Sequence, residues 1–153
     1  MNANIEMLNY IYKNAQMGQN SINHLLDIIK DDSKLRNLLE RQFKEYKIIF
    51  DVAETALNKF GYEAKGTSPL QKFETYMMID LKTISDKSSD HIAEMLIKGS
   101  TMGVIQITRR IKQYTGMLYK EIYTLANKLL ATEQHNIEDC KELLGTSLEP
   151  VTV

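Results

Sequence analysis

The chain has 153 residues, enough for one ordinary domain whose core needs neither disulfides nor a structural metal. Its 20 acidic and 19 basic residues nearly cancel, so neither a nucleic-acid-binding surface nor an acidic tail is expected. No apolar run approaches the roughly 18 residues of a membrane span. With one cysteine and no charged segment leading into an apolar stretch at its start, the chain fits a reducing cytoplasm.

Apolar side chains recur at steps of three and four along the first 60 residues, which predicts two long helices. The first runs from about Asn4 to Lys30, and its buried seam contains one polar member, Gln19. An Asp-Asp-Ser turn at residues 31–33 then starts the second helix at once, so the two must run antiparallel. Gly61 suits the left-handed residue that ends the second helix.

The middle of the chain contains a weaker helical signal. Ser68-Pro69 supplies an N-cap followed by a proline at the first helical position, and predicts a short amphipathic helix from about Pro69 to Ile84. Because both hairpin turns are short, the connection from Gly61 to Ser89 must travel the length of the bundle. Crossover segments in ferritin-like bundles do the same.

Two more long helices follow, from about Asp90 to Tyr114 and, after a turn at Thr115-Gly116, to about Leu144. The expected fold is therefore all-α. It is an up-down four-helix bundle of the ferritin-like kind, with a short crossover helix between the second and third long helices. Residues 1–145 are expected to form one helical-bundle domain, and residues 146–153 a frayed tail.

Two segments carry a resemblance to known proteins: SDHIAEMLIKGSTMGVIQITR at residues 89–109 and IYKNAQMGQNSINHLL at residues 11–26. They resemble an uncharacterised bacterial family of ferritin-like four-helix bundles, over a span from about Met7 to Leu144. The resemblance implies the bundle fold. It assigns no chemical role to either segment.

The ferritin-like class suggests a test for a metal site, since its di-iron members carry Glu on two helices and Glu-x-x-His on the other two. The residues near the midpoints of the four predicted long helices are Gln19, Glu45, Ser100, Thr101 and Glu133. The third residue after Glu45 is Ile48 and the third after Glu133 is Asn136, so both histidines are missing. Two carboxylates without an imidazole make a poor site for iron or manganese.

We therefore expect no metal, no other cofactor and no catalytic residue at this level of the bundle. Burying a carboxylate alone is costly, so the carboxylates must find hydrogen-bond donors, share a proton or reach water. The amides of Gln19 and Asn136 can donate, and so can nearby hydroxyls, that of Tyr46 among them. The sequence thus predicts a polar core layer without metal, made by Gln19, Glu45, Glu133 and Asn136.

Other reactive residue types have a plain structural reading. His91 with Glu94, and His135 with Glu138, have the spacing of one helix face, and each pair is read as solvent-facing. Cys140 falls on the apolar row of the last helix and is read as a small buried hydrophobe. No glycine-rich phosphate loop is present in the sequence.

Gly99 and Gly103 stand inside a helical pattern, where each glycine costs about 1 kcal/mol relative to alanine. Small residues there allow close approach, and tight helix packing is favoured over a ligand cavity. The neighbouring stretch from Met95 to Met102 adds adaptable apolar surface.

These patterns favour a non-enzymatic ferritin-like bundle that acts through protein association. The expected partner is a second copy, as a homodimer or other homo-oligomer, or an unknown protein, because the short helix and the stretch from Met95 to Met102 present more apolar rows than one bundle interior needs. One alternative is a metal-binding or redox ferritin-like protein with a non-standard carboxylate site. A third is a pocket for an apolar small molecule beside the methionines and glycines.

Overall fold

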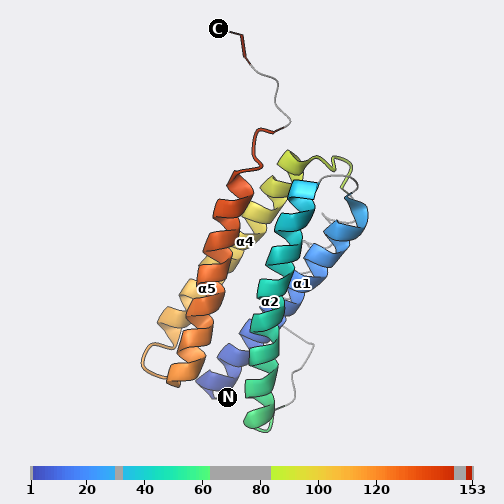
Figure 1. Cartoon of the computed structure of the whole chain (residues 1–153). Helices are drawn as coiled ribbons and strands as arrows, with labels where there is room; N and C mark the ends of the chain where they lie inside the picture. The colour runs from blue at the N-terminus through green and yellow to red at the C-terminus, as the bar shows by residue number, and fades with distance from the viewer. Residues whose placement is uncertain (1, 30–32, 63–83, 147–150, 153) are drawn as a thin grey trace.

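The computed structural model describes residues 2–29, 33–62, 84–146 and 151–152. In these ranges all regular structure is helical, and the helices form a four-helix bundle (Figure 1). With the labels of Figure 1, they are α1 (Ala3–Ile28), α2 (Ser33–Lys59), α4 (Ser89–Gln113) and α5 (Lys120–Lys141). The all-α bundle predicted from the sequence is confirmed. None of the described helices is long and apolar enough to cross a membrane.

Capping residues set several of the helix ends. Asn2 caps α1 by accepting from the Asn4 backbone amide at 2.8 Å, and Ser88 caps α4 with its hydroxyl. After α2, Gly61 adopts a left-handed φ of 74°, as predicted, and Gly116 has a φ of 76° in the turn between α4 and α5. The turn expected at residues 31 and 32 lies outside the described residues.

The helices pack as two hairpins, α1 with α2 and α4 with α5, and α5 also contacts α1 and α2. At one end, Lys59 of α2 lies 3.7 Å from Glu121 at the start of α5. At the other end, the backbone amide of Gly145, just after α5, donates to Asp90 at the start of α4. Hence α2 and α4 run in the same direction, and the end of α2 and the start of α4 lie at opposite ends of the bundle (Figure 1).

This connectivity agrees with the crossover that the sequence predicts. The short helix predicted from Pro69 to Ile84 lies outside the described residues except for Ile84, which is not helical.

The core contains only part of the apolar seams that the helical spacing predicted. In the seam predicted for the first helix, Leu8, Ala15, Ile22 and Ile29 are buried as predicted, whereas Ile5, Tyr12 and Leu26 are partly buried, and Met7, Ile11 and Leu25 fill the core instead. Cys140, 1% exposed, belongs to it, as predicted. Burying each large apolar side chain stabilises the fold by about 1.5–3 kcal/mol. The largest fully buried side chains are Met7, Leu8, Ile11, Ile22, Leu25, Leu35, Leu39, Ile49, Leu57, Ile92 and Ile107. Several polar side chains are buried among them, and they define the site described next.

Candidate functional site

A hydrogen-bonded trio of polar side chains lies buried between α2 and α5. The Tyr46 hydroxyl donates to Glu133 Oε1 at 2.8 Å, and Asn136 Nδ2 donates to the same hydroxyl oxygen at 3.4 Å. All three side chains are buried, Glu133 with 3% and Asn136 with 1% exposure. Asn136 lies three residues after Glu133, on the same face of α5, so one tyrosine from α2 reaches both.

Two glycines, one on each of the other two helices, make room for Tyr46 and Glu133. A Cβ at Gly18 of α1 would lie 2.8 Å from the Tyr46 ring, and one at Gly103 of α4 would lie 2.9 Å from Glu133 Cδ. Any side chain at either position would therefore collide with the pair. All four helices thus shape the site, and the close approach gives a physical reason for a glycine inside each helix.

Burial sets the protonation of the trio. It raises the pKa of Glu133 to about 7, against the opposing effect of the Ser100 and Tyr46 hydroxyls. Burial also raises the pKa of Tyr46 well above 10, and the nearby Glu133 adds to the effect. Tyr46 therefore stays a neutral donor, while the Glu133 carboxyl can gain or lose a proton near neutral pH.

The two carboxyl oxygens of Glu133 differ in their hydrogen bonding. Glu133 Oε2 is buried and finds no hydrogen-bond partner among the described residues, and we call it the open oxygen. Ser21 Oγ on α1, in a side chain with 6% exposure, likewise lacks a partner in the described part of the chain. Buried polar atoms are nearly always hydrogen-bonded, and one left unmet costs about 1–3 kcal/mol.

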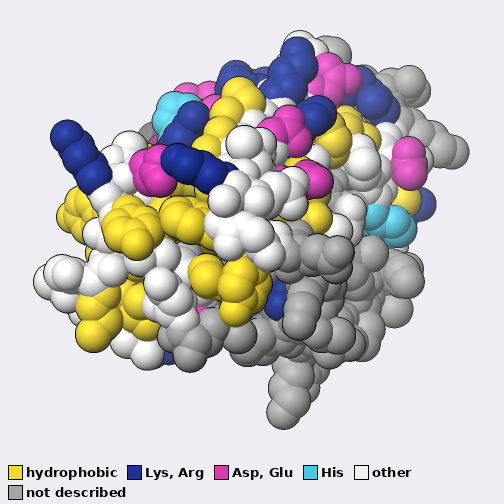
Figure 2. Space-filling model, turned by 90° about the horizontal axis from the view of Figure 1, so that it is seen from below, with side chains coloured by type: hydrophobic (Ala, Val, Ile, Leu, Met, Phe, Trp, Pro, Cys, Tyr) yellow, Lys and Arg dark blue, Asp and Glu magenta, His cyan; other side chains and the backbone are white. Residues whose placement is uncertain are grey.

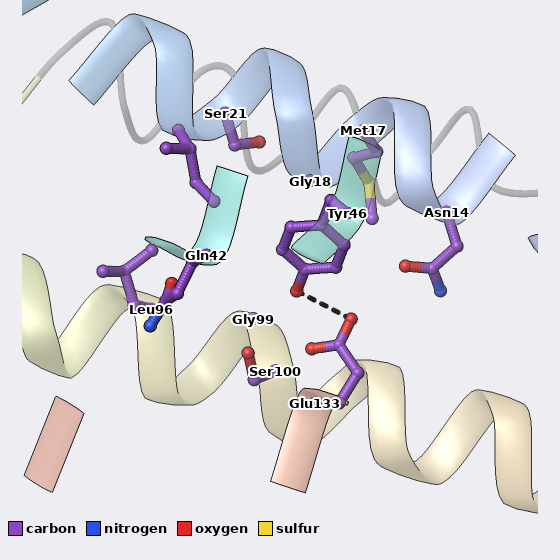
Figure 3. A pocket seen from close by; sticks show the side chains of 11 residues that line it. Asn14, Met17, Gly18, Ser21, Gln42, Tyr46, Leu96, Gly99, Ser100 and Glu133 are labelled. Carbon is purple, nitrogen blue, oxygen red and sulfur yellow. Dashed lines mark hydrogen bonds between the residues drawn. The ribbon is translucent and has the colours of Figure 1, made fainter. Parts of the chain in front are cut away.

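Both of these atoms belong to residues that line a pocket in the bundle (Figure 3). The pocket has an empty volume of about 430 Å³, its open mouth included. Met17, Ile22 and Leu96 give it apolar walls, and Figure 3 shows the Tyr46 hydroxyl and the Glu133 carboxyl pointing toward one another among the lining residues. A concave, mainly apolar site with a few convergent polar groups is the usual form of a small-molecule site.

Two of the four residues expected to form a polar layer lie together, Glu133 and Asn136, because the Tyr46 hydroxyl is hydrogen-bonded to both. Gln19 donates instead to the Ala15 carbonyl of its own helix at 3.4 Å. Glu45 is half-buried; burial raises the pKa of its carboxyl, and His135 and Arg41 partly oppose this shift.

The histidines lie near the surface. His91 Nδ1 is 3.7 Å from Glu94, the spacing that the sequence suggested. His135 Nε2 lies 3.4 Å from Asp139 rather than beside Glu138, which pairs with Lys141 instead, so that suggested pair is wrong. Among the residues that the structure describes, no three His, Cys, Asp or Glu side chains gather as metal ligands do.

Sequence reasoning missed two members of the site, Gly18 and Ser21, and considered Tyr46 only as a possible donor. A signal for Gly18 was present, since it stands inside a long helical pattern, where glycine is unfavourable. Its partner is 28 residues away on another helix, and no spacing rule connects the two. Ser21 has no signature in the sequence at all.

No family model matches the chain, and no curated protein matches it. Among solved structures, the chain is similar to the crystal structure of a DUF305 fragment from Deinococcus radiodurans. The TM-score is 0.75 with 12% sequence identity, over 95% of this chain and 97% of that one. The likeness supports the all-helical architecture, and at this identity it supports the fold alone. It does not establish membership of a ferritin-like family.

Proposed function

We propose that this chain is a non-enzymatic binding module that acts by associating with a second copy of itself. The observation that carries the proposal is an exposed apolar surface at the turn between α4 and α5. Within seven residues, Met117, Tyr119 and Tyr123 are 63%, 53% and 50% exposed. Figure 2 looks onto this end of the bundle, where hydrophobic side chains gather on part of the surface.

The backbone beneath this surface is held in place. Asn4 Nδ2 donates to the Met117 carbonyl at 3.4 Å, and Asn4 Oδ1 accepts from the Tyr119 amide at 2.7 Å. The Tyr119 ring also stacks on Phe60, with 5.8 Å between ring centroids. Methionine and tyrosine are enriched in protein interfaces, and a surface already ordered loses less entropy on binding. A twofold contact would let the same patch meet itself.

The α4 stretch from Met95 to Met102, which suggested self-association, adds a smaller exposed apolar area: Met102 is 38% exposed, and Ile105, just beyond the stretch, is 40% exposed. The short helix that shared in that argument lies outside the described residues.

A non-catalytic role agrees with the state of Cys140. Burial raises the pKa of its thiol to about 11, so the reactive thiolate form is disfavoured. A buried, reduced cysteine also suits the cytoplasmic location that we infer from the sequence.

The test is the mass of the protein in solution, by light scattering over a range of concentrations. We expect about twice the chain mass of 17.6 kDa, and a monomer for the double variant Met117→Lys, Tyr123→Lys. The matched control is Ile48→Lys, Val52→Lys, which changes two similarly exposed apolar residues on α2 and should leave the dimer intact. A wild-type monomer up to about millimolar protein would refute the proposal.

A further inference from the structure

The pocket beside Glu133 is a candidate ligand site separate from the apolar surface at the α4–α5 turn. Two buried polar atoms of its lining, the open oxygen and Ser21 Oγ, come from different helices and have no partner within the described ranges. Three further buried atoms also lack a partner among the described residues, Asn9 Oδ1, Glu45 Oε2 and Asn136 Oδ1, but their residues do not line the pocket. A ligand that supplied donors to the pocket would remove the cost of the two unmet groups in its lining.

The chemistry of the lining favours a donor of positive charge. The strongest acceptor is the Glu133 carboxylate, and the Tyr46 hydroxyl at 2.8 Å fixes its orientation and leaves Oε2 available. The lining residues that the structure describes include no lysine or arginine, so none of them supplies a cation to the carboxylate. A primary ammonium has three donors, which can bond the open oxygen and neighbouring hydroxyls at once.

The shape of the pocket limits the rest of the ligand. Its apolar walls come from Met17, Ile22 and Leu96, and Gly18 and Gly99 expose backbone rather than side chain between them (Figure 3). The space that a water-sized molecule can reach inside the pocket is only about 40 Å³, so the enclosed part suits a small head group such as an ammonium, and a hydrocarbon chain must extend along the apolar walls to the open mouth.

We infer that this pocket binds a small primary aliphatic amine, with the ammonium group on the open oxygen of Glu133 and the hydrocarbon chain against Met17, Ile22 and Leu96. Tyr46 acts as a positioning residue that holds the carboxylate. Gly18 and Gly103 keep the two side chains in place by leaving them room.

The experiment is an NMR titration of the ¹⁵N-labelled full chain with n-butylamine, at about pH 8, where both the Glu133 carboxylate and the ammonium are charged. About 0.15 M salt screens exposed ion pairs. A ligand of so few atoms should bind in the millimolar range at best. We expect saturable shifts of the Gly18, Ser21 and Gly99 amides. Butyrate should cause none, and n-butanol should bind at least about tenfold more weakly, a difference of about 1.4 kcal/mol.

Two variants distinguish amine binding in the pocket from amine binding at a carboxylate outside it. Glu133→Gln keeps the size of the side chain and an acceptor for Tyr46, and should weaken n-butylamine binding about tenfold or more. Glu45→Gln, in a half-buried carboxylate outside the pocket lining, should change it by less than about twofold. The inference is refuted if n-butylamine gives no saturable shift at these amides, if n-butanol binds equally well, if Glu133→Gln binds like wild type, or if Glu45→Gln weakens binding as much as Glu133→Gln.

Discussion

Two buried polar regions of this bundle differ in how their hydrogen bonds are met. At one end, Asn4 is 5% exposed and both ends of its amide bond the backbone of the α4–α5 turn. At mid-height, Glu133 is as deeply buried, yet the open oxygen finds no partner in the described part of the chain. Burial alone therefore does not distinguish a structural polar group from a candidate site. What marks the candidate site is an unmet hydrogen bond on a residue that lines the pocket, since the residues of the other unpartnered atoms, Asn9 Oδ1, Glu45 Oε2 and Asn136 Oδ1, lie outside its lining.

Glycine is also used differently in the two regions. In the turn, Gly116 takes a left-handed φ of 76° that other residues rarely adopt. At mid-height, Gly18 and Gly103 have ordinary helical backbones and serve by leaving space for Tyr46 and Glu133. The first use forms the chain's turn, and the second forms the pocket's polar side.

The largest expected effect is the pH dependence that Glu133 gives to stability. Its folded pKa of about 7 exceeds the ordinary 4.5, so the folded state keeps a proton that the unfolded chain releases between these values. The stabilisation from this proton is complete below about pH 4.5 and is lost as pH rises through about 7, which lowers the free energy of unfolding by up to about 3 kcal/mol. Glu133→Gln has no carboxyl at this position, so its free energy of unfolding should not fall for this reason.

We therefore expect the stability of Glu133→Gln, relative to wild type, to rise between about pH 4.5 and pH 8. Urea unfolding at several pH values measures it. A difference between the two proteins that stays constant over this range would contradict the burial of an ionisable carboxyl at mid-height.

At the α4–α5 turn, removing the buried polar side chain is expected to destabilise the protein. Asn4→Ala leaves the Met117 carbonyl and the Tyr119 amide without their side-chain partner, and should lower the free energy of unfolding by about 1–3 kcal/mol. The control is Asn127→Ala, which removes an exposed amide bonded to the Tyr123 carbonyl of its own helix and should cost less than about 0.5 kcal/mol. Equal losses in denaturant unfolding would show that Asn4 does not hold the turn.

A smaller effect should separate the two glycines. Gly18→Ala places a Cβ against the stiff Tyr46 ring, whereas Gly103→Ala meets the flexible Glu133 side chain. Overpacking costs about 1–3 kcal/mol, and the better helix propensity of alanine returns about 1 kcal/mol. We expect Gly18→Ala to be the less stable variant in thermal unfolding. The reverse order would mean that the Tyr46 ring is free to shift.

The smallest effect is expected for Glu45→Gln, which should stay within about 1–2 kcal/mol of wild type because Glu45 is only half-buried. The same variant tests the metal alternative through elemental analysis of protein purified without chelators. Stoichiometric iron or manganese in wild type, lost in Glu45→Gln, would replace the account of a metal-free layer with that of a carboxylate metal site.

The sequence predicted the helices and the Gly61 cap because their signals are local, although it did not single out the N-caps Asn2 and Ser88. Spacings of three and four give α1 and α5, and Gly61 and Gly116 are turn residues by their own chemistry. The site was predicted only in part, because its geometry joins positions far apart in the chain. Glu45 and Glu133 stand at equal height along their helices, which suggested that they would meet. In the structure Tyr46, the next residue of α2, faces α5 and bonds Glu133 instead. Helix rotation is set by packing of the whole core.

The most direct test of the central claim is a ¹³C NMR titration of the glutamate side-chain carboxyls, with Glu133→Gln used to assign the Glu133 signal. The account predicts a Glu133 midpoint at about pH 7, because the carboxyl is buried with one oxygen open. A Glu133 midpoint near the ordinary 4.5 would contradict it, since the carboxyl would then be hydrated or paired with a cation.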